Sequence, residues 1–182
     1  MRHPLADELN LISGNPATCQ YDASPEVALA AVRAHEGPIL IDLDETLYLR
    51  NSTEDFIDCA LPGLLALLLL RVLDVLKPWR LTGIDTRDTW RVCAISTCLP
   101  WTRWRWRAKV PFLAERYVNQ ELKAALKTRS RPPTILTSGF APIVAPLLAA
   151  MGFANAPLIA ARMCSPADRR DGRKWQDPTV LL

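Results

Sequence analysis

Several features that would assign a class of protein are missing from this sequence of 182 residues. Its formal net charge is only +3, which is too small to indicate a nucleic-acid-binding protein by itself. The two histidines, His3 and His35, are isolated and have no partner at metal-ligand spacing. The five cysteines are odd in number and form no C-x-x-C pair, so neither a disulfide framework nor a zinc site is favoured. A reduced, cytoplasmic setting is therefore expected.

Long apolar segments are also missing. Residues Met1–Asn10 mix charged and apolar side chains, unlike the uninterrupted apolar stretch of a secretory signal. The most apolar run, Leu61–Leu70, continues toward Leu76 only past Arg71 and Asp74. Because a spanning helix needs about 20 mostly apolar residues, we expect this run to form a buried or membrane-touching helix.

Hydrophobic residues make up 49% of the chain, which is ample material for a core. Three short apolar runs predict strands: Ile39–Ile41, Thr134–Leu136 and Leu158–Ala161. The first of them suits a strand that is buried on both faces of a parallel sheet. A helix is predicted over Ala141–Met151, ended by Gly152. Strand, helix and strand in this order indicate a βαβ unit.

The predicted elements divide the chain into three parts. Residues 1–36 form an N-terminal segment with one helix, which Ser24 is expected to cap. Residues 37–48 and 130–182 form the sheet-containing core. Residues 49–129 are mostly helical in pattern and too long for a single crossover helix, so we interpret them as an inserted helical subdomain.

Two carboxylates follow the first predicted strand. Asp42 and Asp44 would lie at the carboxyl end of a parallel strand, where open α/β sheets bind ligands. Because like charges push pKa values apart, one carboxylate can attack phosphorus while the other acts as an acid. Mg²⁺ held by carboxylate and carbonyl oxygens would offset the repulsion of an anionic substrate. The plainer interpretation is a simple turn after a strand.

The stretch Ile39–Leu47 resembles the first motif of the haloacid dehalogenase superfamily, in which an apolar strand precedes D-x-D-x-T. This resemblance implies that Asp42 is the nucleophile and Asp44 the general acid/base. It also implies a Mg²⁺ ion bound by Asp42 and by the backbone carbonyl of Asp44. The fold it implies is α/β, a three-layer Rossmann-like parallel sheet with a helical cap inserted after the first strand.

The stretch Thr134–Phe140 resembles the second motif of that family, and in particular its phosphoserine-phosphatase-like branch. By register, Thr137 supplies the hydroxyl that binds phosphate, and Thr46 of the first motif is a further phosphate-binding candidate. Ser138 and Gly139 would present backbone N–H groups at the start of the next helix, which is a ready anion site. The plainer alternative is a helix N-cap.

The third motif is a lysine or arginine, and Asp168–Lys174 looks similar to the stretch that precedes it. Lys174 is the first candidate for the catalytic cation and Arg173 the alternative; a solvated surface charge is the plainer interpretation. The family's fourth motif, a strand ending in acidic residues, is not found in residues 175–182, because Asp177 follows no apolar strand. We therefore expect weak Mg²⁺ binding, negligible turnover and low solubility or stability for this chain.

Tryptophan and arginine alternate in Trp101–Lys109. The favoured interpretation is a helix with its tryptophans packed inward and its arginines in water. A membrane interface is the alternative, supported by Leu61–Leu70, and nucleic acid is the least favoured partner. Three residues just after the first motif give a weak indication of a substrate pocket: Arg50, Asn51 and Ser52. Four carboxylates of the insert are expected on solvated helix faces: Asp55, Asp58, Asp85 and Asp88.

These features together predict a Mg²⁺-dependent phosphomonoester hydrolase that acts on a small or lipid-linked phosphate. The protein would be cytoplasmic, or peripheral to a membrane. The alternative belongs to another class: a catalytically silent, membrane-apposed interaction module that keeps the fold of a phosphatase, or a truncated fragment of the enzyme.

Overall fold

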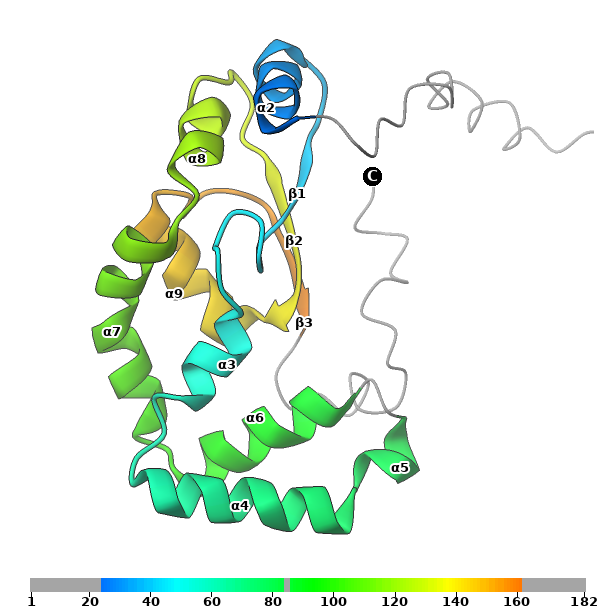
Figure 1. Cartoon of the computed structure of the whole chain (residues 1–182), viewed down its shortest axis with the longest axis vertical. Coiled ribbons are helices and arrows are strands. Elements are labelled where there is room, and N and C mark those ends of the chain that lie inside the picture. The colour runs from blue at the N-terminus through cyan, green and yellow to red at the C-terminus, as the bar shows by residue number, and fades with distance from the viewer. Residues whose placement is uncertain (1–23, 84–85, 162–182) are drawn as a thin grey trace, which may run out of the picture.

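The computed structural model describes residues 24–83 and 86–161. This part of the chain combines helices with a parallel sheet, which confirms the α/β class (Figure 1). In chain order the elements are α2 (Pro25–Ala34), β1 (Leu40–Asp42), α3 (Ser52–Ile57), α4 (Gly63–Leu76), α5 (Trp79–Thr82), α6 (Arg87–Cys98), α7 (Thr102–Tyr117), α8 (Gln120–Lys127), β2 (Thr134–Phe140), α9 (Ala141–Met151) and β3 (Leu158–Ala161).

The described strands form one parallel sheet in the order β1-β2-β3. Ile41 of β1 pairs with Ile135 of β2, and Ile135 in turn pairs with Leu158 of β3. The first two predicted strands are therefore neighbours and parallel, as expected. Helix α9 connects β2 to β3 and ends at Gly152, whose φ of 89° lies in the left-handed region that glycine adopts without strain. The predicted βαβ unit is thus confirmed.

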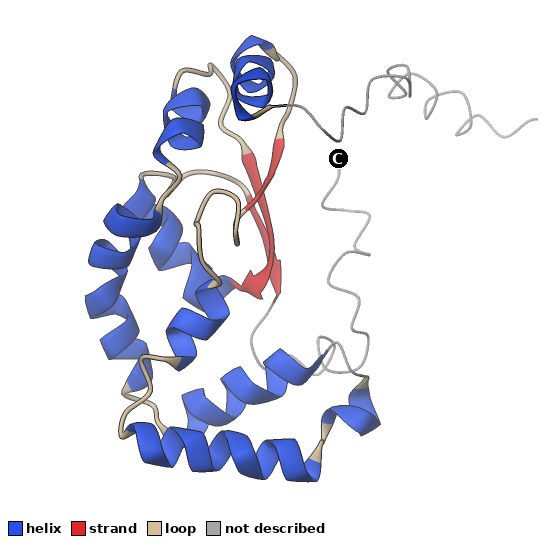
Figure 2. Ribbon diagram, in the orientation of Figure 1, coloured by secondary structure: helices blue, strands red, loops and turns tan. Residues whose placement is uncertain are grey.

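Helices cover one face of the sheet in the described part of the chain (Figure 2). Ile41 and Ile135 lie on the covered face and are buried, whereas Leu40 is 55% exposed. The expectation that β1 is buried on both faces is therefore wrong, because no described helix packs against its second face. The described residues form two layers, the sheet and the helices on one of its faces. The three-layer Rossmann-like arrangement stays a prediction.

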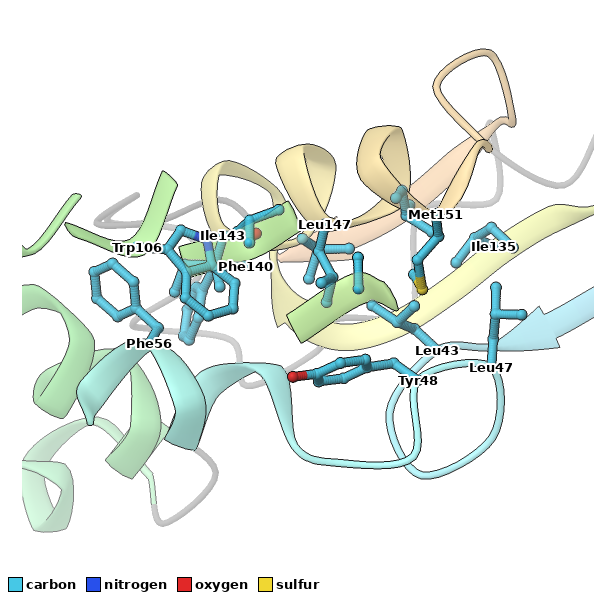
Figure 3. Close-up of a cluster of buried hydrophobic side chains, with 14 of the residues drawn as sticks. Leu43, Leu47, Tyr48, Phe56, Trp106, Ile135, Phe140, Ile143, Leu147 and Met151 are labelled. Atoms are coloured by element: carbon cyan, nitrogen blue, oxygen red, sulfur yellow. Dashed lines mark hydrogen bonds between the residues drawn. The ribbon is translucent and has the colours of Figure 1, made fainter. Parts of the chain in front are cut away.

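The core lies between the sheet and its helices (Figure 3). Helix α7 packs along α9, and the buried Trp106 indole donates a hydrogen bond to the carbonyl of Ile143 at 3.0 Å. Phe56 of α3 meets the Trp106 ring edge to face, with 6.1 Å between ring centroids. Burial of each large apolar side chain stabilises the fold by about 1.5–3 kcal/mol. These contacts join the insert to the βαβ unit.

The insert is helical, as its pattern predicted. Helices α4 and α6 pack on each other and form a layer on the side toward which the carboxyl ends of the strands point (Figure 1). Arg91 of α6 forms an ion pair of 2.5 Å with Glu54 of α3, which ties this layer to the helix that follows the first motif. No described helix is long and apolar enough to cross a bilayer.

Two local expectations change. Ser24 precedes α2 as its N-cap residue, but its side chain makes no capping hydrogen bond there. Cys93 is disulfide-bonded, whereas Cys59 and Cys98 are free. The sequence predicted no disulfide framework and did not single out Cys93, because disulfide formation depends on proximity in space and not on spacing in sequence.

Candidate functional site

The turn after β1 holds both motif carboxylates at the carboxyl edge of the sheet. The N–H of Leu43 continues the strand pairing by donating to the Leu136 carbonyl at 3.2 Å. The Leu43 carbonyl then accepts from the N–H groups of Leu47 at 3.1 Å and Tyr48 at 2.8 Å. Leu43, Leu47 and Tyr48 are fully buried and attach the turn to the hydrophobic core (Figure 3). The apolar positions of the first motif thus fix where its aspartates lie.

Glu45 is strained at the tip of this turn. Its φ of 62° is in the left-handed region, which is unfavourable for a residue with a Cβ atom. The turn persists because both of its sides are bound elsewhere: Leu49 N–H donates to the Tyr117 carbonyl at 2.8 Å, and Asn119 N–H donates to the Leu47 carbonyl at 2.9 Å. The α7–α8 junction therefore holds the turn in place from outside the motif.

Asp44 connects three elements through its carboxylate. Oδ1 accepts from the backbone N–H of Ser52 at 2.7 Å, at the start of α3. Oδ2 accepts from the Thr137 hydroxyl of β2 at 2.9 Å. The first and second motifs are therefore in direct contact, although more than ninety positions separate these two residues. Asp42 and Thr137 share one edge of the sheet, as the parallel arrangement predicted.

Thr137 is 1% exposed, and its hydroxyl already has partners. Oγ1 donates its single proton to Asp44 and accepts from the N–H of Gly139 at 2.9 Å. A phosphate could receive the Thr137 proton only if this hydroxyl left Asp44. The phosphate-binding role of Thr137 stays a prediction.

Gly139 is tightly packed between β2, the start of α3 and α9. A Cβ atom there would be 2.9 Å from Val144 Cγ2 and 3.2 Å from Ser52 Oγ. Strand β2 continues to Phe140, and α9 begins only at Ala141. The expectation that Ser138 and Gly139 start a helix is therefore wrong, because both residues still have the extended backbone of β2.

Ser52 is the residue whose importance the sequence indicated only weakly. It is fully buried, and its Oγ atom has no hydrogen-bond partner among the described residues. The side chain of Asn51 caps α3 by accepting from the N–H groups of Thr53 at 3.0 Å and Glu54 at 3.1 Å. This cap aims the Ser52 N–H at Asp44. An Asn-Ser pair after a D-x-D motif is the signal that pointed to it.

Asp55 forms a buried cluster beside the site. Its carboxylate accepts from the Tyr48 hydroxyl at 2.5 Å and from Arg50 Nη2 at 2.5 Å. The Arg50 guanidinium also lies 4.9 Å from the centre of the Tyr117 ring. Asp55 is only 5% exposed, so the expectation of a solvated carboxylate is wrong at this position. The reason is that the Tyr48 hydroxyl donates a hydrogen bond to the Asp55 carboxylate and Arg50 forms an ion pair with it.

The other insert carboxylates agree with expectation where they are described. Asp58 and Asp88 are exposed, and Asp88 forms a 3.2 Å ion pair with Arg91 on the same helix. Asp85 lies outside the described residues. Within Trp101–Lys109, Trp106 points inward but Trp104 is 74% exposed, so the expectation of inward tryptophans is wrong at Trp104.

The surroundings of the two motif carboxylates differ. Partial burial raises the pKa of Asp42 above its ordinary value, and the charges of Asp44 and Glu45 raise it further. A hydrogen bond from the Leu43 N–H acts in the opposite direction. The Asp42 side chain is exposed, whereas both oxygens of Asp44 are bound. A cation beside Asp42 would relieve the repulsion that this pair of charges creates.

The donors at this edge fit a magnesium ion in chemical type. Asp42 supplies a carboxylate and Asp44 a backbone carbonyl, which are the hard oxygen ligands that Mg²⁺ prefers. No group of three histidine, cysteine or acidic side chains is placed to hold a metal within residues 24–83 and 86–161. Because Mg²⁺ usually keeps several waters and one or two carboxylates, this partial set suits a largely hydrated ion.

Thr46 and Ser138 are the other predicted site residues that the structure describes. Thr46 is exposed on the turn, and among described groups no hydrogen bond joins its hydroxyl to Asp44 or Thr137. Ser138 is exposed on β2. Lys174 and Arg173 lie outside the described residues, so their contribution stays a prediction.

Two cavities of the described part lie away from the motif carboxylates. A cleft of about 410 Å³ is lined by residues such as Pro133, Gly152 and Arg129, which places it at the opposite end of the strands. A smaller cavity of about 60 Å³ lies between Phe56, Trp106 and the first turn of α9. Because the larger cleft contains none of the motif residues, hydrogen-bonding geometry identifies the site better than volume does.

Comparison with known protein families, with curated proteins and with solved structures gave no match. The candidate site therefore rests on its own geometry. That geometry consists of an exposed Asp42, a doubly bound Asp44, and a buried hydroxyl pair from Ser52 and Thr137.

Proposed function

We propose that this chain carries the site of a Mg²⁺-dependent phosphomonoester hydrolase. The observation that carries the proposal is the 2.9 Å hydrogen bond between Asp44 and Thr137, which joins two motifs across neighbouring parallel strands. Ligands of open α/β sheets bind at this edge. The substrate class is a small or lipid-linked phosphate monoester.

The two carboxylates take different roles in the proposed reaction. An Asp42 oxygen attacks phosphorus, the bond from phosphorus to the leaving oxygen breaks, and an aspartyl phosphate forms. Asp44, in its protonated form, gives its proton to the leaving oxygen and becomes a carboxylate. That carboxylate then removes a proton from a water that attacks phosphorus, the bond from phosphorus to the Asp42 oxygen breaks, and phosphate leaves. The exposure of Asp42 supports its role as nucleophile. The fixed position of Asp44 supports its role in proton transfer, since proton transfer requires a well-oriented carboxyl group.

Positive charge is required beside these groups, because the substrate phosphate and two carboxylates are all anionic. Asp42 and the Asp44 carbonyl would hold Mg²⁺, which supplies that charge when bound. The hydrogen bonds from the Ser52 N–H and the Thr137 hydroxyl hold the Asp44 carboxylate in one orientation. Lys174 is the proposed second cation.

Phosphate release from a panel of phosphate monoesters, with and without Mg²⁺, tests the proposal. Asp42→Asn keeps the shape of the side chain but removes the attacking charge, so turnover should fall by about three orders of magnitude or more. Mass spectrometry of acid-quenched protein should find a phosphoryl group on the peptide that contains Asp42. Asp58→Asn is the matched control, because Asp58 is exposed and outside the contact. Undiminished turnover in Asp42→Asn would remove Asp42 from this role.

A second candidate is a catalytically silent, membrane-apposed module. It is favoured by the Thr137 hydroxyl and the Gly139 N–H, both of which are already bound within the protein. The same assay separates the two candidates: a folded chain that releases no phosphate from any ester, at any Mg²⁺ concentration, would support the silent module.

A further inference from the structure

Helix α4 presents a stripe of apolar side chains to solvent. Leu64 is 82% exposed, Val75 is 81% exposed and Leu76 is 70% exposed. The members recur at helical spacing and so occupy one face. We call this face the α4 stripe; it consists of Leu64, Leu65, Leu67, Leu68, Val72, Val75 and Leu76.

The opposite side of α4 already has its partner. Ala66 and Leu73 are buried on the side that packs against α6. Asp74, the one acidic residue of α4, forms a 3.2 Å ion pair with Arg87 of α6. Because these contacts fix which side of the helix faces inward, the stripe cannot turn into the core without breaking them. Soluble monomers rarely expose an apolar surface of this extent without a use for it.

Exposed apolar and aromatic side chains also lie in the segments beyond the two ends of α4. Leu81, in α5, is 92% exposed. At the other end, Trp101 is 39% exposed, and its indole donates to the Leu61 carbonyl at 2.5 Å. Trp104 follows one helical turn later and is 74% exposed. Tryptophan at the border of an apolar surface is typical of the interface between water and lipid headgroups.

Exposed arginines lie in and near this surface, and Asp74, the acidic residue of α4, is paired with Arg87. Arg71 lies within the α4 stripe, Arg80 is adjacent to Leu81, and Arg103 and Arg107 are exposed on the same helix as Trp104. No acidic side chain lies in the stripe. An apolar face with arginines at its centre and border matches a bilayer whose headgroups carry negative charge.

We propose that the α4 stripe docks onto the surface of an anionic lipid bilayer, with the axis of α4 in the membrane plane. The helix has 14 residues, which corresponds to about 21 Å at 1.5 Å per residue. The hydrocarbon core of a bilayer is about 30 Å thick, so a helix of this length lies in the interface and does not span.

A second copy of the chain fits this surface less well. A symmetric antiparallel pairing of two α4 stripes would have its axis near the middle of the helix. Arg71 lies within two residues of that point, so the two Arg71 side chains would meet as like charges. An anionic headgroup neutralises the same arginine.

Docking would place the candidate catalytic edge toward the membrane, since the carboxyl ends of the strands point toward the layer formed by α4 and α6 (Figure 1). The docking proposal does not depend on catalysis and stands even if the chain hydrolyses no phosphate ester.

Vesicle flotation with the full 182-residue chain tests the proposal. The chain should float with vesicles of phosphatidylcholine and phosphatidylglycerol, and less with phosphatidylcholine alone. Leu64→Gln combined with Leu68→Gln should weaken partitioning by about tenfold or more, because two exposed leucines no longer enter the interface. Arg71→Gln should lower binding to the anionic vesicles by roughly fivefold and leave the neutral vesicles unaffected.

Val27→Gln is the matched control, because Val27 is 52% exposed on α2, at the far end of the described structure from α4 (Figure 1). Its binding should equal that of the unaltered chain, and circular dichroism should show that every variant is folded. Failure of the unaltered chain to bind anionic vesicles would overturn the proposal. So would light scattering that finds a dimer which the Leu64 and Leu68 changes dissociate, because the occupant would then be a second copy.

Discussion

Removal of Asp55 should destabilise the fold, because this buried carboxylate holds the turn of the first motif against α3. In Asp55→Ala the Tyr48 hydroxyl, fully buried, would lose the oxygen that lies 2.5 Å away. Arg50 would lose its ion pair at the same time. The question is how much each loss costs.

The two losses differ in size because their exposure differs. A buried hydroxyl left without a partner costs about 1–3 kcal/mol. The Arg50 side chain is 43% exposed, so water can solvate its charge, and that pair contributes about 0–1 kcal/mol. We expect Asp55→Ala to lower the free energy of unfolding by about 2–3 kcal/mol. For a chain of this size that corresponds to a fall in melting temperature of roughly 5–10 °C.

A double-mutant cycle with Tyr48→Phe isolates the contact. Tyr48→Phe removes the hydroxyl, so a later loss of Asp55 leaves no buried donor without a partner. The two changes should therefore be non-additive, with a coupling energy of about 1–2 kcal/mol. Urea unfolding followed by far-ultraviolet circular dichroism gives the four stabilities.

Asp58→Ala serves as the control, since Asp58 is exposed at the end of the same helix, and its stability should stay within about 0.5 kcal/mol of the unaltered chain. If Asp55→Ala has no larger effect than this control, or if the cycle is additive, the cluster does not hold the turn.

Three further changes have defined outcomes. Gly139→Ala should lower stability by about 1–3 kcal/mol in urea unfolding, because its Cβ atom would lie 2.9 Å from Val144 Cγ2; unchanged stability would contradict this contact. Burial and the hydrogen bond to Asp55 raise the pKa of Tyr48. The protonated Tyr48 hydroxyl therefore makes its full contribution to the free energy of unfolding below about pH 10, and this contribution is lost as pH rises above that value. Tyr48→Phe should therefore lose less stability at alkaline pH than the unaltered chain does. If the stability of the two chains falls equally with rising pH, this prediction is wrong. Because its folded pKa is raised, ionised Asp42 destabilises the fold at neutral pH; Asp42→Asn should therefore stabilise by less than about 1 kcal/mol at pH 7, with no difference below about pH 3. A stability loss in Asp42→Asn at pH 7 would refute that sign.

Local patterns in the sequence determined the elements that carry the site. Short apolar runs predicted the three strands, because their length and their β-branched residues favour a strand over a helix. Gly152 predicted the end of α9, because it adopts the left-handed φ that closes a helix. The D-x-D spacing placed two carboxylates just beyond β1, and parallel pairing with β2 followed from strand order. These features depend on neighbours in the chain, which the sequence displays directly.

The tertiary structure alone decided which side chains meet and which face water. Nothing near Asp44 in the chain shows that the Thr137 hydroxyl will bind it, or that the unpartnered Ser52 hydroxyl lies beside Gly139. The apolar run of α4 was equally compatible with burial, and its exposure was decided by how α6 covers the opposite side. Asp55 has the sequence context of a surface carboxylate, yet it is buried. A side chain's burial depends on partners that are distant in sequence, and only the folded chain brings those partners to it.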